Sequence, residues 1–488
     1  MPPERHVYLL SPRELSPETI AVAFAKTSRS PESFREIAAG LSDERSAQFH
    51  EKWVVGYGHA SVAEHAVLHV AFENISRLAI ESLESNRLAS YTEKSTRYQK
   101  WLPDDFHVPE ALHAHHLLPS YLNVCRQLFA TYLETLDSVR AVILQRAARR
   151  DQESDEALDR RLRSQYVDVC RFLLPASALA NVGMTANARV LENAIRKMLS
   201  HELAEVRQIG EQVKAVATTE VPTLVKYADA APHISRTRLD LMEAAAKAFS
   251  GHASPAATRA ETGAGPSEVS RIPYCVLVDY DPDGENRVLA ASMYRHSGVP
   301  MERALAYVKA LDGEGRRALA RDTLGGLAEH DVPIRELEYC TYTFELLMDQ
   351  GAFAEFKRHR IMTQTPQRLT TRLGYSVPRL MVDAGCGAKY EDALGLASDL
   401  YEKLAAFDPF VAQYVIPNGF HRRVLCQFNL REAFAFCELR SAPNAHFSIR
   451  RIAGQIAHAL RGVHPLLSQY MRLPAETPDE LDAHYFVP

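Results

Sequence analysis

The sequence predicts an α+β fold that is built twice, in two related halves joined by a linker. The linker is indicated by residues 250–270, which are rich in Ala, Ser, Gly and Pro and almost lack large apolar side chains. A duplication is indicated because similar segments recur in the same order on both sides of this stretch. Both halves also mix helical and strand-like periodicity. We therefore predict domains over residues 1–232 and 272–488, with a helix and linker over 233–271.

The composition is that of a globular protein rather than a disordered one. The chain has 488 residues, 46% of them hydrophobic and 24% charged, with a net charge of −5. This charge gives no global attraction to nucleic acid or to anionic membranes, so any anion site must be local. No apolar run approaches the roughly 20 residues that span a bilayer, and the N-terminus lacks a signal-peptide pattern. Seven cysteines, an odd number without a C-x-x-C motif, predict free buried thiols. We expect a cytoplasmic protein that does not bind membranes.

The repeat is clearest around two prolines. Arg171–Pro175 reads RFLLP and Gln413–Pro417 reads QYVIP, and an asparagine follows each proline by twelve residues, Asn187 in the first half and Asn429 in the second. The two copies keep the order of these segments although the chain between them differs in length. This indicates a duplicated domain whose copies have diverged.

Individual elements follow from periodicity. The stretch that begins at Glu64, which is answered by a similar stretch at Glu338, could be a strand or a helix, and we favour a strand over 64–72. Further strands are predicted over 6–10 and 274–281. Amphipathic helical periodicity extends over 118–146 and 187–217.

The most polarised segment lies between residues 357 and 379. It contains six Lys or Arg residues and no acid, which indicates an anionic partner because neighbouring cations repel one another. The alternative is a solvated basic turn whose cations pair with acids elsewhere in the fold. A nucleic-acid partner is not expected, since few aromatic residues interleave with the basic ones.

A second polar segment, EKSTRY, places Glu93, Ser95 and Arg97 at alternate positions. On an extended backbone these side chains share one face, where they could hold a polar ligand. The alternative is a surface strand of mixed charge.

No metal site is predicted. His59, His65 and His69 have a spacing that could bind a metal, but no third ligand lies at a diagnostic distance, so we interpret them as core or supporting histidines. Neither a P-loop nor a Rossmann glycine motif occurs.

The order of these segments resembles the flavin-dependent thymidylate synthase family, whose signature is R-H-R-x-x-S-x-N-x-x-S-x-R-Y. The resemblance covers most of residues 55–217 and about 333–455, so the chain resembles a tandem fusion of two such domains. It implies an antiparallel sheet flanked by helices in each copy. In the family the domains assemble as a homotetramer with FAD and deoxyuridylate between subunits.

The two copies have lost complementary parts of the signature. In the first copy the R-H-R triplet reads Ser85-Asn86-Arg87, and Met198 stands where the family has a late substrate arginine, although the EKSTRY segment is kept. The second copy keeps Arg358-His359-Arg360 and the late arginine, Arg440. It loses the other part, with replacements at Pro366, Arg368, Thr370, Gln413 and Ala435.

This complementarity predicts one composite site, in which the second copy supplies the R-H-R turn and the first supplies Glu93, Ser95, Arg97 and Arg171. Two such chains would form a homodimer that mimics the family tetramer. The resemblance implies FAD contacts for His59, Asn187, Asn193, Arg358, His359, Arg360 and Asn429. It implies nucleotide contacts for Glu93, Ser95, Arg97, Arg171 and Arg440.

The implied activity is the reductive methylation of dUMP, with FAD as cofactor and NADPH and methylenetetrahydrofolate as co-substrates. No nucleophile from the protein is expected, because the cofactor supplies the difficult chemistry. Two alternatives remain open: one-carbon transfer by a flavin enzyme to a different pyrimidine-type substrate, and a noncatalytic nucleotide-binding paralogue.

Overall fold

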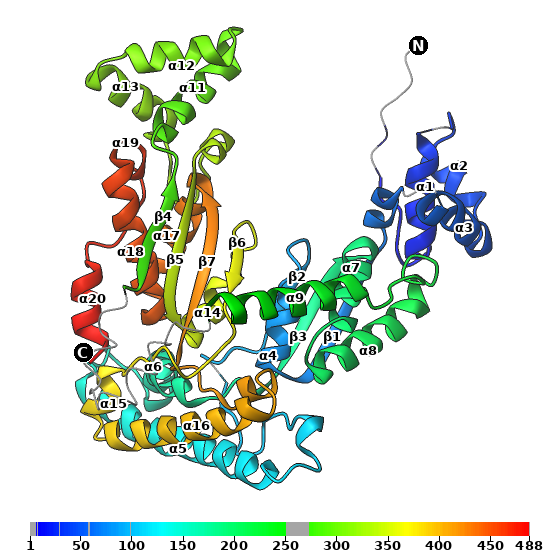
Figure 1. The fold of residues 1–488 in the computed structure, drawn as a ribbon. Helices are drawn as coiled ribbons and strands as arrows, with labels where there is room; N and C mark the ends of the chain where they lie inside the picture. Colours follow the sequence, from blue (N-terminus) through cyan, green and yellow to red (C-terminus); the bar gives the residue numbers. More distant parts are fainter. Residues whose placement is uncertain are drawn as a thin grey trace. The chain divides into compact units, whose positions relative to one another are not determined.

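The computed structural model describes residues 6, 8–28, 30–56, 59–97, 99–249 and 273–487. They form two compact units (Figure 1). The first takes the described residues up to Ser95, then Phe106–Leu118, and Ser177 to the end of the helix at 249. The second takes Thr96–Asp105, Pro119–Ala176 and the described residues from 273 onward. The units therefore do not follow the halves of the sequence, because two stretches of the first half, Thr96–Asp105 and Pro119–Ala176, belong to the second unit. The boundaries at 232 and 272 stay a proposal about the two copies along the chain, and the predicted linker at 250–270 lies outside the described residues.

The first unit is built on a three-stranded antiparallel sheet of order β1-β3-β2. Its strands are β1 (Val67–Ser76), β2 (Ser90–Glu93) and β3 (Leu179–Asn187). Its α-helices are α1 (Pro17–Thr27), α2 (Phe34–Ala39), α3 (Asp43–Phe49), α4 (Arg77–Glu84), α7 (Ala188–Leu199), α8 (Ala204–Glu220) and α9 (Pro232–Phe249). Short helices of other types are η1 (His50–Gly56), η2 (Ala60–His65) and η3 (Glu110–Leu112).

The second unit has a four-stranded antiparallel sheet of order β4-β5-β7-β6. Its strands are β4 (Cys275–Tyr280), β5 (Thr341–Asp349), β6 (Thr363–Pro366) and β7 (His421–Asn429). Helices from the first half of the sequence are α5 (Leu118–Arg146), α6 (Asp155–Cys170) and η4 (Arg171–Leu173). Those from the second half are α11 (Gly284–Ser297), α12 (Met301–Ala310), α13 (Gly313–Leu324), η6 (Arg335–Tyr339), α14 (Gln350–Phe356), α15 (Arg379–Asp383), α16 (Gly387–Phe407), η7 (Val411–Val415), α17 (Leu430–Ser441), α18 (Phe447–Val463), α19 (Pro465–Ser468) and α20 (Pro478–Tyr485).

Both sheets repeat one local design, in which a strand runs directly into a helix through a capping side chain. Ser76 and Asp349 accept the hydrogen bonds that begin α4 and α14. Asn187 and Asn429 do the same for α7 and α17. Strand registers agree with the repeat, since β1 meets β3 at Asn187 and β5 meets β7 at Asn429. The duplication inferred from sequence is thus confirmed in the topology.

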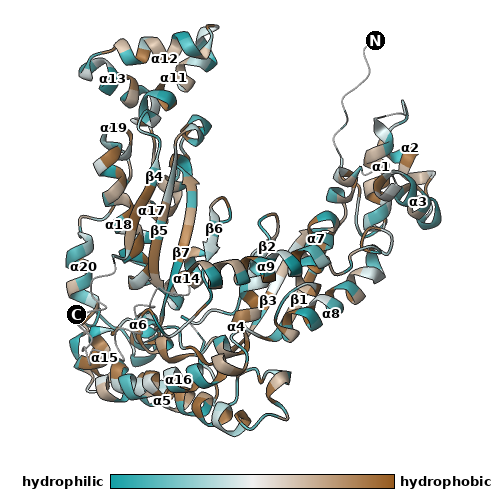
Figure 2. Cartoon of the chain, viewed as in Figure 1, coloured by the Kyte–Doolittle hydropathy of each residue, from teal (hydrophilic) through white to brown (hydrophobic). Residues whose placement is uncertain are grey.

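The core of the second unit lies between the sheet and the helices that cover it. Along β7 buried and more exposed residues alternate, as a half-buried strand requires. Phe344 of β5 stacks on Phe428 of β7 with ring centroids 5.5 Å apart. Figure 2 shows hydrophobic residues concentrated along the central strands and along α17 and α18. Burial of this face stabilises the unit by roughly 25 cal/mol per Å² of apolar surface.

Several element predictions are confirmed and two need correction. The helix over 118–146 is α5, the strand over 274–281 is β4, and the favoured strand at 64–72 is β1, which begins at Val67 after a 3-10 turn. The helical stretch 187–217 is broken into α7 and α8. The strand predicted over 6–10 is wrong for the described residues there, which form no strand. This segment contains β-favouring residues, but its described residues pair with no other strand, and β-propensity alone does not form a strand.

The matched RFLLP and QYVIP segments lie against each other inside the second unit. Pro175 and Pro417, the prolines that define the repeat, form an antiparallel bridge. Backbone hydrogen bonds from Asn418 N to Leu174 O (3.0 Å) and from Ala176 N to Ile416 O (2.9 Å) flank the bridge. Equivalent residues of the two copies thus contact each other as they would across a two-fold axis.

All seven cysteines are free, and six of them are buried, as predicted. Among the described residues, no helix has the length and apolar character needed to cross a membrane.

Candidate functional site

The R-H-R turn of the second copy follows α14 and precedes β6. Its central residue points inward, because His359 is buried against the ring of Phe436, at 4.8 Å between centroids. Arg358 and Arg360 on either side are exposed. The Gln364 side-chain amide fixes the turn by donating to the carbonyl of His359 at 2.9 Å. Two guanidinium groups are therefore presented to solvent on a turn with a defined backbone.

His359 is held in one neutral form by partners on both ring nitrogens. Arg440 Nε lies 3.0 Å from His359 Nε2, and because Nε of arginine can only donate, Nε2 must accept. The proton therefore sits on Nδ1, which donates to Glu432 Oε1 at 2.9 Å. Burial lowers the pKa of His359, and the Arg440 charge acts in the same direction, whereas the hydrogen bond that His359 donates to Glu432 raises it.

One buried carboxylate, Glu355, contacts an arginine from each of the two copies. Glu355, on α14 of the second copy, accepts from Arg440 Nη1 at 3.0 Å through Oε2. Its Oε1 lies 3.5 Å from Nη2 of Arg171, which belongs to the first copy and is only 3% exposed. Glu355 thus holds an arginine from each copy in one unit.

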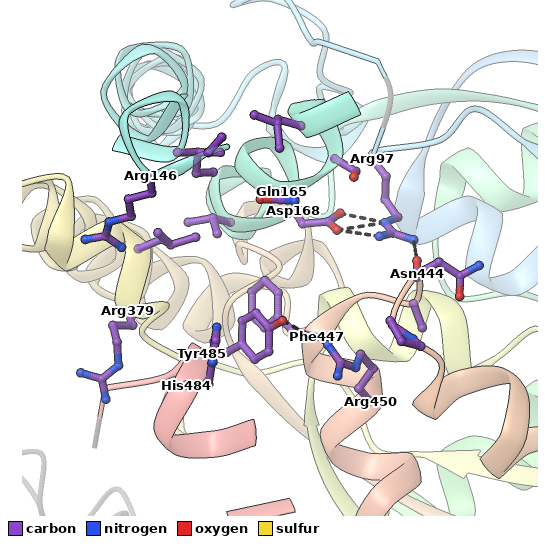
Figure 3. Close-up of a pocket in the computed structure, with 18 of the residues that line it drawn as sticks. Arg97, Arg146, Gln165, Asp168, Arg379, Asn444, Phe447, Arg450, His484 and Tyr485 are labelled. Atoms are coloured by element: carbon purple, nitrogen blue, oxygen red, sulfur yellow. Dashed lines mark hydrogen bonds and ion pairs between the residues drawn. The ribbon is translucent and has the colours of Figure 1, made fainter. Parts of the chain in front are cut away.

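Arg171 continues the chain of contacts toward Arg97. Its Nη1 donates to Thr96 Oγ1 at 3.0 Å, and its Nε is 4.0 Å from a carboxylate oxygen of Asp168. Asp168 is gripped by Arg97 through two nitrogens, with Nη2 to Oδ2 at 2.7 Å and Nε to Oδ1 at 2.9 Å (Figure 3). The remaining Nη1 of Arg97 donates to the carbonyl of Asn444 at 2.9 Å. Bidentate pairing of this kind fixes both side chains.

We call this continuous set the composite cluster, and its members are Arg97, Asp168, Arg171, Glu355, Arg440, His359 and Glu432. With His359 neutral, three guanidinium groups face three carboxylates. An anionic ligand that binds these arginines must therefore either displace one of the carboxylates or bind the guanidinium edges that the carboxylates leave uncovered. Arg358 and Arg360 lie outside the composite cluster and are exposed.

The structure assembles part of the predicted site. Arg97, Arg171, His359 and Arg440 come together in the second unit, and Arg358 and Arg360 share the turn of His359. Asn429 caps α17, the helix that carries Glu432 and Arg440. Five other predicted site residues belong to the first unit, and they are His59, Glu93, Ser95, Asn187 and Asn193.

Those first-unit residues have local contacts of their own. Glu93 forms an ion pair with Arg77 at 2.7 Å, and Asn187 caps α7. His59 is exposed beside Trp53, and Asn193 is exposed on α7. The expectation that residues 93–97 are extended with one shared face is wrong, because β2 ends at Glu93 and the chain turns at residues 96 and 97.

The basic stretch at 357–379 was predicted either to bind an anionic partner or to pair with acids elsewhere in the fold, and its arginines differ in this respect. Arg372 forms a two-nitrogen ion pair with Glu402 at 2.9 and 3.1 Å, and Arg368 lies over the ring of Phe410 at 5.0 Å. Arg372 therefore follows the alternative of pairing with an acid elsewhere in the fold, whereas Arg368 packs on an aromatic ring. The exposed arginines of the R-H-R turn still suit an anionic partner.

Sequence reasoning missed the acids of the composite cluster. Asp168 stands three residues before Arg171 at a helix end, a spacing that places both side chains on one face. Glu432 stands three residues after Asn429, where a capping-box residue is expected, yet it binds His359 instead. Glu355 carried no comparable signal, because its partners are distant in sequence. Among the described residues, no group of three or more His, Cys, Asp or Glu could hold a metal ion.

Comparisons with known proteins agree with this duplicated architecture. The chain matches the family described as "Thymidylate synthase complementing protein" twice, over residues 11–223 and 276–466. A UPF0159 protein of Chlamydia muridarum is 31% identical over 440 residues, covering 88% of this chain and 82% of that protein. A flavin-dependent thymidylate synthase of Clostridium tetani is 25% identical over 215 residues, covering 43% of this chain and 82% of that protein.

A solved structure of a UMP/dUMP methylase from Streptomyces cacaoi, bound with 5-bromo-dUMP, is 18% identical with a TM-score of 0.33, covering 40% of this chain and 93% of that chain. The two matches to the family model together span well over half of the sequence. The chain therefore belongs to the thymidylate synthase complementing protein family and carries two copies of its domain in tandem.

Proposed function

We propose that the protein is a flavin-dependent enzyme that reductively methylates dUMP, with methylenetetrahydrofolate and NADPH as co-substrates and a composite site in the second unit. The observation that carries the proposal is the composite cluster, in which Arg97 and Arg171 of the first copy join His359 and Arg440 of the second through Glu355. Family membership supports the reaction class, since relatives in this family are flavin-dependent thymidylate synthases.

The donor set of the second-copy turn fits FAD. Arg358 and Arg360 are exposed on a fixed turn, which suits the phosphates of a dinucleotide. The first-copy turn does not fit, because Asn86 is buried and donates to the carbonyl of Leu83 within its own turn. When bound, the flavin would supply the electrons that complete the methyl group.

The protein residues would orient the reactants and balance charge. Arg440 is fixed between His359 and Glu355, so its guanidinium is positioned before any ligand arrives. Neutral His359 accepts from Arg440 through Nε2, which leaves the arginine charge undiminished beside a developing pyrimidine anion. Arg97, 18% exposed in its side chain, is the cluster arginine best placed to reach a nucleotide phosphate from solvent.

The first experiment is a visible spectrum of the purified full-length chain with FAD, before and after dUMP. We expect a flavin band that survives desalting and shifts when dUMP is added. Arg358→Gln with Arg360→Gln should abolish flavin retention, whereas Arg87→Gln in the first-copy turn should leave it intact. Retained flavin in the double variant, or no flavin in the unaltered chain, would overturn the proposal.

Turnover is then tested with dUMP, methylenetetrahydrofolate and NADPH, followed by separation of dUMP from its methylated product. A second candidate, one-carbon transfer to a different pyrimidine-type substrate, is favoured by the carboxylates that occupy Arg97 and Arg171 in the composite cluster. Running UMP, dCMP and dUMP side by side separates the two candidates. Flavin retention without methylation of any of them would instead favour a noncatalytic nucleotide-binding protein.

A further inference from the structure

A pocket of ≈ 840 Å³ lies in the second unit beside the composite cluster (Figure 3). Its walls come from the turn that carries Arg97, from α5, α6 and α15, from the start of α18, and from the end of α20. This size is in the range of about 300–1,000 Å³ that is typical of small-molecule sites. Of the composite cluster only Arg97 and Asp168 line it, so it is distinct from the R-H-R turn.

One part of the pocket is suited to a flat ring. Phe447 and Tyr485 stack with ring centroids 5.1 Å apart and planes inclined by 6°. The Tyr485 hydroxyl accepts from Arg450 at 3.1 Å, which fixes the ring. Aliphatic side chains add apolar surface, namely Ile143, Leu162, Val169 and Leu380. Stacking on such a surface contributes of order 1 kcal/mol beyond the area that is buried.

The charged lining is predominantly basic. Five arginines line the pocket against two aspartates, and the arginines are Arg97, Arg146, Arg161, Arg379 and Arg450. Arg146 pairs with Asp383 at 2.8 Å but remains 57% exposed. Arg379 donates to the backbone carbonyls of Ala483 and Phe486, and in the described part of the chain it forms no ion pair. The side of the pocket near α15 therefore carries positive charge that an anion can use.

The wall formed by Tyr485 belongs to a segment beyond the family match, which ends at residue 466. This segment is fastened in place, since Val487 N donates to Val377 O at 2.9 Å and Phe486 forms a bridge with Pro378. A capping box at Thr477 begins α20. The pocket is thus completed by C-terminal residues that lie outside the matched range.

We propose that this pocket is a second ligand site, for an organic anion whose flat ring packs beside Tyr485 and whose carboxylate or phosphate binds Arg146 and Arg379. The proposal does not depend on the function proposed above, because binding is measured without flavin or turnover. An anion that also reaches Arg97 competes with Asp168 for its guanidinium group. Ligand binding in this pocket therefore weakens the Arg97–Asp168 ion pair of the composite cluster.

The test uses three fluorescent probes with the same ring: 2-naphthoate, 2-naphthyl phosphate and neutral 2-naphthylmethanol. Fluorescence anisotropy of each probe is recorded against full-length protein. We expect saturable one-site binding of an anionic probe, with the alcohol at least about tenfold weaker, as loss of one charge-assisted contact predicts. The tighter of the two anions identifies the carboxylate or the phosphate as the natural anionic group.

Variants distinguish this pocket from nonspecific adsorption. Arg146→Gln, which removes only an exposed ion pair, should weaken the anionic probe about tenfold, and Tyr485→Ala should weaken all three probes. Arg163→Gln is the matched control and should change nothing, because Arg163 of α6 is also an exposed arginine with one aspartate partner but does not line the pocket. Equal binding of alcohol and anions, or affinities unchanged in both Arg146→Gln and Tyr485→Ala, would overturn the proposal.

Discussion

The two copies of the turn after the first sheet helix show how one backbone design serves two different purposes. In the second copy, buried His359 lies between Arg440 and Glu432. In the first copy the matching residue is Asn86, which is also buried but donates to its own turn at Leu83. The strand before this helix pairs with the Asn-capped strand in both copies, so the difference within the turn is carried by its side chains. Retention of the fold therefore says little about retention of the site.

A second pair of positions shows what divergence has kept. In the first copy, the cap residue Ser76 hydrogen-bonds Glu205 of α8 at 2.6 Å. In the second copy, the cap residue is Asp349, and it accepts from Ser448 of α18. The cap position carries the hydroxyl in the first copy and the carboxylate in the second, and the helix packed against it carries the other group. The buried contact is therefore kept although the two groups have changed places. Buried polar groups need hydrogen-bond partners, but the donor hydroxyl can stand either at the cap or on the packed helix.

Removal of the carboxylate that joins the two copies should have the largest effect on stability. Glu355→Gln leaves the buried Arg171 and the partly buried Arg440 without their shared anion, and we expect a loss of about 3–5 kcal/mol. The matched control is Ser82→Ala at the corresponding place in α4 of the first unit, followed at Trp53 in a Trp101→Phe background, with a change below about 0.5 kcal/mol. Urea unfolding can be followed at Trp101, which is fully buried in the second unit, in a Trp53→Phe background. A loss under about 1 kcal/mol for Glu355→Gln would contradict the role we assign to this ion pair.

The late arginine should come next in magnitude. Arg440→Met introduces the residue type that the first copy has at Met198, and it removes the donors to both His359 and Glu355. Because Glu355 keeps Arg171 as a partner, we expect a smaller loss of about 2 kcal/mol in the same unfolding assay. Flavin-dependent activity should fall together with stability. Full activity at unchanged stability would show that the second copy does not need this arginine.

The neutral form of His359 gives a pH dependence that the matching residue of the first copy, Asn86, cannot give. The pKa of His359 is lowered from 6.5 in the folded protein, so the unfolded chain takes up the proton at higher pH than the folded one. The stability that depends on this group is full above pH 6.5 and is lost as the pH falls toward the lowered pKa. His359→Asn, which copies Asn86, should reduce the slope of unfolding free energy against pH by up to about 1.4 kcal/mol per unit. Urea titrations at pH 7.5, 6.5 and 5.5 measure this, and identical slopes would show that His359 titrates normally.

How much of the molecule could be predicted depended on whether the signal was local. The helix at 118–146 was predicted to the residue because its amphipathic pattern is continuous, and the capping asparagines 187 and 429 marked the repeat. The strand at 6–10 failed because β-propensity needs a partner that sequence does not reveal. The complementary losses in the two signatures predicted that Arg171 would share a site with the second-copy R-H-R turn, but they did not decide whether Arg440 would belong to it. Glu355, which joins Arg171 to Arg440, could not be found, since its contacts join residues more than 80 positions apart.

Substitution of Lys197 in the first copy should have the smallest effect on stability, in contrast to substitution of Arg440 in the second. The Lys197 ammonium donates to the Asn86 amide oxygen at 3.3 Å, while burial and the nearby Arg87 lower its pKa. A cation with one neutral partner and a repelling neighbour contributes little net stability, so Lys197→Met should change the unfolding free energy by less than about 0.5 kcal/mol. The measurement is urea unfolding followed at Trp53 in a Trp101→Phe background, with Arg440→Met followed at Trp101 as its counterpart. A loss comparable to that of Arg440→Met would mean that the first-copy turn has kept an electrostatic role of its own.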